Sequence, residues 1–540
     1  MFSYEVPRNQ RLLQCACAII WCLLSGGPIF GFAALKPVLI TEHVYEYMCD
    51  ISINGTSSAS SSLWAMEAPT SLTNALLTKV FTTSEPKDIV AKCTQQDLKL
   101  NMMFTVGAVL TNVSALAIGR VLDVYGPRVC GLVGAFFLFL ASFVFIYADF
   151  LVENTPIDPY LTGYASMALG GPFAYISSFQ LSNSFPKNSG TILALVTGAF
   201  DASSAVFLFY KIFYVKTNGA FSLGNFFKLY SLVPVFITVV EFLIMPAESY
   251  QTPADNNLCV DDEIEHHVSP INSDHSHTES TPLLDDTLSP PPINKRRDSI
   301  GDALKQPYAE EGEEFLVEHT GGVFGILHGY SAQYQIQTPW FVLTCLFATI
   351  QMLRINYFVA TIGTQYAYLF GSVTEAEHLN KIFDIALPLG GIVSVPFIGI
   401  FLDNCSTVLV LSVLLSISLV IGFLGLVSNF FLGVVGVLMF VAYRPLFYTT
   451  VSDFCAKVFG FETFGTVYGA IICISGIFNF GQSILDKWTH TSFNMNPIPI
   501  NVILIAVTAA IGVANILYVK TQAQAFIEKK RIAARASVTP

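Results

Sequence analysis

Long apolar stretches separated by short polar ones make up most of this chain. A helix of about 20 predominantly apolar residues crosses the hydrocarbon layer of a membrane, and twelve stretches approach or exceed that length. In the first half of the chain they cover 12–35, 101–119, 129–147, 160–183, 190–214 and 226–245. In the second half they cover 339–366, 382–402, 407–427, 430–450, 463–484 and 499–519. The pattern predicts an all-α polytopic membrane protein with twelve transmembrane helices.

Composition supports the membrane assignment. The chain is 53% hydrophobic and only 12% charged, whereas about 25% of the residues of a soluble domain are charged. Its formal net charge of −12 comes from one segment, because 17 acidic and 4 basic residues lie between Glu248 and Glu318. The acidity therefore belongs to a loop between the two halves and says nothing about a substrate.

The apolar pattern and the charges together divide the chain into four parts. Residues 1–245 are predicted to form an N-terminal bundle of six helices, with a luminal or extracellular loop at 41–98. Residues 246–338 form an acidic cytosolic loop, predicted to be disordered because its composition cannot bury a core. Residues 339–520 form a second bundle of six helices, and 521–540 form a cytosolic tail. Lys and Arg are enriched in the segments that this arrangement places in the cytosol, so both termini are expected there.

The first long loop has the chemistry of an oxidising compartment. Cys49 and Cys93 are its cysteines and are a candidate disulfide pair, the alternative being two unpaired thiols. The same loop carries a glycosylation acceptor at Asn54, which is followed by Gly55 and Thr56.

A short motif is repeated at matching places in the two halves, after the second and the eighth predicted helices. In each copy a glycine precedes an aspartate by four positions. The first copy continues with a further glycine and an arginine, which the second lacks. The residues are Gly119, Asp123, Gly126 and Arg128 in the first copy, and Gly399 and Asp403 in the second.

This repeat resembles the loop motif of the major facilitator superfamily. The resemblance implies two six-helix bundles that alternate in opening to each side of the membrane, with the motif acting as a gate. Glycine lets two helices approach closely, and the aspartate accepts hydrogen bonds from a neighbouring helix end. The gating role of the incomplete second copy is less well supported.

Two Gly-Gly-Pro sequences interrupt predicted helices. Gly26 and Gly27 lie in the first helix, and Gly170 and Gly171 lie in the fourth. These helices correspond to one another in the inverted repeats of facilitator folds. Such a sequence opens the backbone hydrogen-bond ladder and permits a bend or a close approach of substrate. The alternative is ordinary close packing of membrane helices.

Three ionisable residues lie at mid-depth in predicted helices, where a charge is costly. They are Asp201, Arg354 and Arg444, and Gln351 shares a helical face with Arg354. An arginine and an aspartate together can bind a zwitterionic solute, the arginine its carboxylate and the aspartate its ammonium, so Arg354 and Asp201 are predicted substrate ligands. The alternative is an internal Asp–Arg pair that joins helices. For Arg444 this structural role is the preferred interpretation.

The stretch from Pro339 to Gly363, with Arg354 ahead of an aromatic-rich turn, resembles the seventh helix of the solute carrier 43 family. The run from Asp201 to Ser204 resembles that family as well. The resemblance implies facilitated diffusion of large neutral amino acids. Two alternatives remain: a proton-coupled facilitator of another small organic solute, and a non-transporting receptor or scaffold. No enzymatic motif is present, and neither a cofactor, a metal nor nucleic acid is expected.

The central loop contains a candidate sorting signal of the acidic dileucine type. Its residues are Glu279, Leu283 and Leu284. A signal of this kind is read by adaptor proteins and favours a vacuolar or lysosomal membrane, with the plasma membrane as the alternative. The expected partners are therefore an amino acid substrate, membrane lipid and a sorting adaptor.

Overall fold

The structure, a computed structural model, describes residues 5–50, 94–250, 317 and 319–538. Within these residues every regular element is a helix. The N-terminal half contains α1 (Arg8–Trp21), η2 (Cys22–Gly26), η3 (Pro28–Gly31), α2 (Phe32–Thr41), α3 (Tyr47–Asp50), α5 (Thr94–Val113), α6 (Ala115–Ile146), α7 (Ala148–Asn154), α8 (Pro159–Ser178), η5 (Phe179–Ser184), η6 (Pro186–Asn188), α9 (Ser189–Ala202), α10 (Ala205–Lys216), α11 (Leu223–Tyr230) and α12 (Leu232–Leu243). The C-terminal half contains α15 (Ala332–Gln337), α16 (Pro339–Phe370), α17 (Val373–Asn404), α18 (Thr407–Leu424), α19 (Phe430–Phe459), α20 (Phe464–Phe478), α21 (Gly481–Thr491) and α22 (Ile498–Val538).

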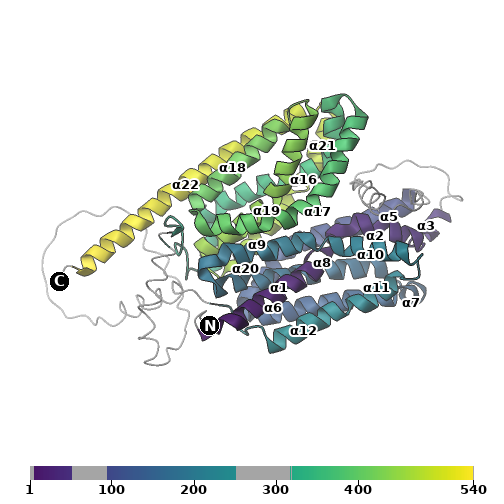
Figure 1. The fold of residues 1–540 in the computed structure, drawn as a ribbon, viewed down its shortest axis with the longest axis horizontal. Coiled ribbons are helices and arrows are strands. Elements are labelled where there is room, and N and C mark those ends of the chain that lie inside the picture. The colour runs from purple at the N-terminus through teal and green to yellow at the C-terminus, as the bar shows by residue number, and fades with distance from the viewer. Residues whose placement is uncertain (1–4, 51–93, 251–316, 318, 539–540) are drawn as a thin grey trace.

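The helices form two bundles that lie side by side (Figure 1). The halves meet where α9 packs against α17 and α19, and where α20 packs against α5 and α6. Helices α18 and α22 lie on the side of the C-terminal half that faces away from the N-terminal half (Figure 1). Both described ends of the chain lie at one end of the molecule, which we call the terminal end. The other end is called the opposite end.

The predicted all-helical membrane architecture is confirmed. Eight helical stretches among the described residues are each long and apolar enough to cross a membrane. The other predicted spans correspond to the interrupted first helix, to α5, to α8 and to α17.

Helix starts and ends follow the local sequence. Thr338 caps α16 by accepting a hydrogen bond from the Phe341 amide, and Pro339 occupies the first helical position, where no amide hydrogen is needed. The same helix ends at Gly371, whose φ of 62° suits glycine.

Two predicted boundaries differ from the structure. Helix α6 covers parts of two predicted segments, and these two helical parts meet at a kink at Gly126 (φ 82°), where the backbone has non-helical angles. The fifth predicted helix breaks at Ser203 and Ser204 into α9 and α10. Both side chains bond to carbonyls three residues earlier, which competes with the regular helical pattern.

The range 246–338 was predicted to be disordered, and its described ends are instead packed on the two halves. Tyr250 is fully buried, and its hydroxyl donates to Gln14 Oε1 at 2.6 Å. At the other end of the range, the Gly325 and Leu327 amides donate to the carbonyls of Lys457 and Val458, each at 3.0 Å. The prediction was based on the average composition of the range. That average does not reveal the apolar residues at its two ends, which pack on the helix bundles.

Candidate functional site

Asp123 joins the two halves at the terminal end. Its carboxylate accepts hydrogen bonds from the backbone amides of Gly465 and Thr466, at 2.8 and 2.6 Å. These amides belong to the first turn of α20, which has no intrahelical acceptors for them. A carboxylate there satisfies two free donors and lies at the positive end of the helix dipole. We call this arrangement the first clasp.

Asp403 makes the same arrangement in the other direction. Its carboxylate accepts hydrogen bonds from the amides of Gly190, at 2.8 Å, and Thr191, at 3.1 Å. The Thr191 hydroxyl donates to it as well. These groups lie in the first turn of α9, so an aspartate of the C-terminal half caps a helix of the N-terminal half. We call this the second clasp, and it forms although the later glycine and arginine of the motif are missing.

The glycines of the motif allow the helices to come this close. A Cβ atom on Gly119 would lie 1.8 Å from the Gly465 carbonyl oxygen, and one on Gly399 would lie 2.7 Å from Thr191 Cα. Gly126 provides the turn, and Arg128 donates to the Met245 carbonyl at 2.8 Å. Each predicted motif residue therefore lies at or beside the contact between the halves at the terminal end.

The two Gly-Gly-Pro sequences pack against each other. A Cβ atom on Gly171 would lie 2.4 Å from the Gly26 carbonyl oxygen, and one on Gly170 would lie 2.9 Å from that of Gly134. Gly27 has non-helical backbone angles, and its amide donates to Ser203 Oγ at 2.6 Å. The first helix is broken as predicted, whereas α8 continues through its own copy. These contacts support close helix packing, and a role in substrate binding stays a prediction.

Asp201 lies against Arg444, in the middle of the molecule and between the halves. Arg444 Nη2 on α19 is 3.6 Å from Asp201 Oδ1 on α9. The side chains of Arg444 and Asp201 are 26% and 12% exposed, so neither is completely covered by protein atoms. Tyr448, one turn further along α19, lies beside the guanidinium. The pair is thus an ionic contact between the two halves. Charged groups at this depth of a membrane are energetically costly, and those that occur there commonly serve a function.

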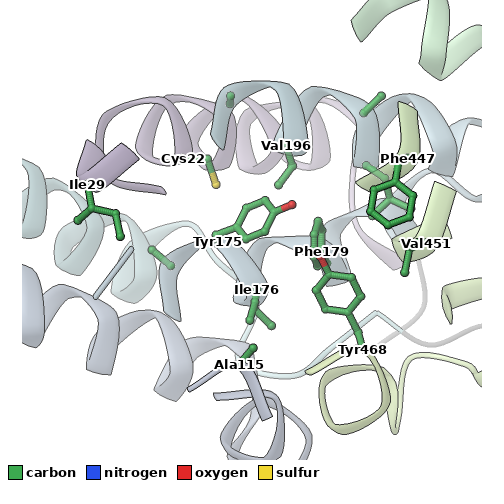
Figure 2. Close-up of a cluster of buried hydrophobic side chains, with 14 of the residues drawn as sticks. Cys22, Ile29, Ala115, Tyr175, Ile176, Phe179, Val196, Phe447, Val451 and Tyr468 are labelled. Carbon is green, nitrogen blue, oxygen red and sulfur yellow. The ribbon is translucent and has the colours of Figure 1, made fainter. Parts of the chain in front are cut away.

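Aromatic side chains fill the space between this pair and the terminal end. The rings of Tyr175 and Phe179 are 4.6 Å apart, and those of Phe179 and Tyr468 are 5.3 Å apart (Figure 2). The Tyr175 hydroxyl donates to Thr197 Oγ1 at 3.3 Å, one turn before Asp201. Because the rings come from both halves, they form a floor under the Asp201–Arg444 pair that the halves share.

Arg354 lies elsewhere, inside the C-terminal half. Its guanidinium donates to the hydroxyl and the carbonyl of Ser418 on α18, at 2.7 and 3.1 Å. The Ser418 hydroxyl donates in turn to Gln351 Oε1 at 2.8 Å. The structure therefore brings Arg354 and Gln351 together, as their shared helical face predicted, but it pairs Asp201 with Arg444.

Several predicted residues lie outside the described part of the chain. They are Asn54, Cys93, Glu279, Leu283 and Leu284. Cys49 takes part in a disulfide bond, and its predicted pairing with Cys93 stays a prediction.

Sequence reasoning missed the helix ends that receive the clasps. They had a signal, because Gly190 and Thr191 in α9 repeat as Gly465 and Thr466 in α20. These two helices follow the fourth and the tenth predicted helices, which are equivalent positions in the two halves. A glycine and a threonine at the same place in both repeats indicate a shared contact.

Comparisons with known proteins agree with this geometry. No model of a protein family matches the chain. Protein FMP42 of Saccharomyces cerevisiae is 44% identical over 95% of this chain and 96% of its own length. The equilibrative nucleobase transporter 1 of Bos taurus is 20% identical over 92% and 94% of the two chains. The human large neutral amino acids transporter small subunit 3 is 24% identical over 53% and 49%.

Among solved structures, the major facilitator superfamily proton:xylose symporter XylE matches with a TM-score of 0.51 at 13% identity, over 94% of this chain and 95% of that one. The fold of this chain is that of the major facilitator superfamily. The chain belongs to the same family as protein FMP42. The resemblance to the solute carrier 43 family is confirmed by the relatives named above. The chain is a multi-pass membrane protein.

Proposed function

We propose that this facilitator moves neutral amino acids across the membrane by alternating access, without coupling to an ion gradient. The observation that carries the proposal is the Asp201–Arg444 pair, which is partly exposed, lies at mid-depth and joins the two halves. The large neutral amino acids transporter among the relatives supports the substrate class.

The chemistry of the pair suits a zwitterion. A guanidinium binds a carboxylate through two parallel hydrogen bonds, and an aspartate accepts an ammonium. When an amino acid enters between Asp201 and Arg444, its carboxylate takes the place of Asp201 beside Arg444. Its ammonium takes the place of Arg444 beside Asp201. The site then stays neutral as a whole, so neither side chain is left buried and unpaired. A solute with a single charge would leave one of them unpaired.

The clasps give the proposal its direction. In this structure both aspartates hold the terminal end shut, and the aromatic floor lies between that end and the ion pair. The substrate would therefore enter from the opposite end, and release to the other side would require both clasps to open. Substrate that breaks the Asp201–Arg444 contact loosens a third link between the halves, which couples binding to that step. Arg354 as a substrate ligand stays a prediction, and the contacts of Asp201 favour Arg444 for that role.

Transport by the purified protein in liposomes tests the proposal. Uptake of labelled leucine should be blocked by excess leucine, but far less by isocaproate, which lacks the ammonium, or by leucine amide, which lacks the carboxylate. Asp201→Asn and Arg444→Gln should each reduce uptake at least tenfold, because each leaves one end of the zwitterion unmatched. Uptake should be the same with and without a pH gradient.

A second candidate substrate is a nucleobase. The nucleobase transporter among the relatives matches nearly the whole chain, and the rings of Tyr175, Phe179 and Tyr468 could stack on a flat base. Labelled adenine in the same liposomes separates the candidates. Uptake of adenine without uptake of leucine would contradict the amino acid proposal.

We also propose that the protein resides in the membrane of an internal acidic organelle, on the basis of the candidate sorting signal of Glu279, Leu283 and Leu284. Replacing both leucines with alanine should move the protein to the cell surface without changing transport per molecule, and a fluorescent fusion would show this. Identical localisation of the two proteins would contradict the sorting role.

A further inference from the structure

The C-terminal half contains a cavity that is separate from the Asp201–Arg444 pair. It has a volume of about 50 Å³ and is lined by residues of α16, α18, α19 and α22. Arg354, Gln351, Ser418 and Tyr443 line it near the middle of the helices. Residues near the opposite end line it too, among them Asn501 at the start of α22. A small solute could therefore reach Arg354 from the opposite end.

The guanidinium of Arg354 has a positive charge that no described side chain balances. No aspartate or glutamate among the described side chains forms an ion pair with it, and its hydrogen bonds go to the neutral Ser418. A buried cation without a counter-charge costs several kcal/mol. Gly422 keeps the space next to the guanidinium open, since a Cβ atom there would lie 2.8 Å from Arg354 Nη2.

The neighbouring polar groups are arranged as donors. The Ser418 hydroxyl oxygen accepts from Arg354, so its own hydrogen goes to Gln351 Oε1. This fixes the amide of Gln351 with its NH₂ group as the remaining donor. Gln351 is 1% exposed, and its Nε2 atom has no hydrogen-bond partner in the described part of the structure. The cavity therefore offers a positively charged guanidinium and an unused amide donor, and no described carboxylate pairs with them. These groups are suited to bind an anion.

The cavity has room for a small anion. One water molecule requires roughly 10–15 Å³, and the cavity of about 50 Å³ accommodates a monatomic anion with some water. We propose that the C-terminal half binds a small monovalent anion of the chloride type between Arg354 and Gln351. The bound anion supplies the counter-charge that the protein does not, and it stabilises the contact between Arg354 on α16 and Ser418 on α18.

Thermal unfolding of the detergent-solubilised full-length protein tests this proposal. Sodium chloride is compared with sodium gluconate at equal concentration, because gluconate is too large for the cavity. The midpoint for the wild type should be several degrees higher in chloride and should rise with chloride concentration, since a ligand stabilises the folded state that binds it.

One substitution replaces the anion with a fixed charge. Gln351→Glu places a carboxylate beside Arg354, so this protein should be stable in both salts and should lose its dependence on chloride. Gln337→Glu is the matched control, because it makes the same change at the exposed end of α15, outside the cavity, and should keep the chloride dependence.

Three results would overturn the proposal. Equal midpoints for the wild type in both salts would mean that the cavity holds only water. A chloride dependence that survives in Gln351→Glu would place the ion elsewhere. Stabilisation of the wild type by leucine in gluconate, absent in Gln351→Glu but present in Arg444→Gln, would make Arg354 the substrate ligand. None of these results depends on whether leucine is transported, so failure here is distinguishable from failure of the proposed function.

Discussion

The two clasps use the same chemistry with different surroundings. In both, an aspartate that follows a glycine by four positions caps the first turn of a helix in the other half. The first clasp has a glycine turn at Gly126 and an arginine, whereas the second leaves its helix through an extended Cys405. The comparison shows that the carboxylate and the close-packed glycine are the parts a clasp needs, and that the turn can be built in more than one way.

Each clasp also lies beside a part of the central loop or its start. Near the first clasp, Arg128 donates to the carbonyl of Met245, just before the loop begins. Near the second, His319 Nε2 lies 2.6 Å from the carbonyl oxygen of Asp403, thirteen residues before α15 begins. The loop thus begins beside one clasp and passes the other before it ends.

The largest expected effect comes from adding a side chain at the helix crossing. Gly119→Ala should prevent closure of the terminal end, because its Cβ would lie 1.8 Å from a backbone oxygen that cannot move alone. Gly399→Ala should do less, because its nearest contact is 2.7 Å away and one neighbouring atom is a rotatable hydroxyl. Distances between spin labels on the terminal ends of α6 and α20, and of α9 and α17, would measure the closure. Equal opening in the two variants would contradict this difference.

A smaller effect is expected from removing either carboxylate, and Asp403→Ala should have the larger one of the two because it also loses the hydrogen bond from the Thr191 hydroxyl. Asp123→Ala and Asp403→Ala each lose two amide hydrogen bonds to a charged acceptor, which are worth about 2 kcal/mol in total after the released groups find water. That corresponds to a change on the order of thirtyfold in the ratio of closed to open protein.

The same spin-label distances would show the populations, and the double variant should add the two effects. The sequence alone predicted a weaker role for Asp403 because its motif is incomplete. A much smaller effect of Asp403→Ala than of Asp123→Ala would restore that prediction.

The sequence predicted the features that depend on the pattern within a single helix or segment. Twelve apolar segments, two halves and the repeated glycine and aspartate follow from local pattern, and the shared face of Arg354 and Gln351 follows from helical spacing. The partner of Asp201 could not be obtained this way, because two arginines lie at similar depths in different helices. Only packing decides between them: Arg354 turns toward α18, whereas Arg444 faces α9.

The ends of the central loop could not be predicted for a related reason. Composition is averaged over a window, and the acidic middle of the loop outweighs Tyr250 and Leu327 at its ends. Whether such a residue is buried depends on a surface that the rest of the chain forms. The close packing of Gly26 on Gly171 likewise needed both helices to be placed.

The smallest expected effect comes from removing one hydroxyl, that of Thr191, which belongs to the second clasp. Thr191→Val keeps the shape of the side chain and the amide hydrogen bond to Asp403 but removes the hydroxyl that also donates to that carboxylate. One such hydrogen bond contributes about 1 kcal/mol, so the closed population should fall about fivefold relative to the open one. Thr191→Ser, which keeps the hydroxyl, is the matched control and should stay near the wild type.

In an Asp403→Ala background, Thr191→Val should have no further effect, because its acceptor is gone. In an Asp123→Ala background it should keep its full effect, since the first clasp does not use Thr191. An undiminished effect of Thr191→Val without Asp403 would show that the hydroxyl acts on α9 itself and not through the second clasp.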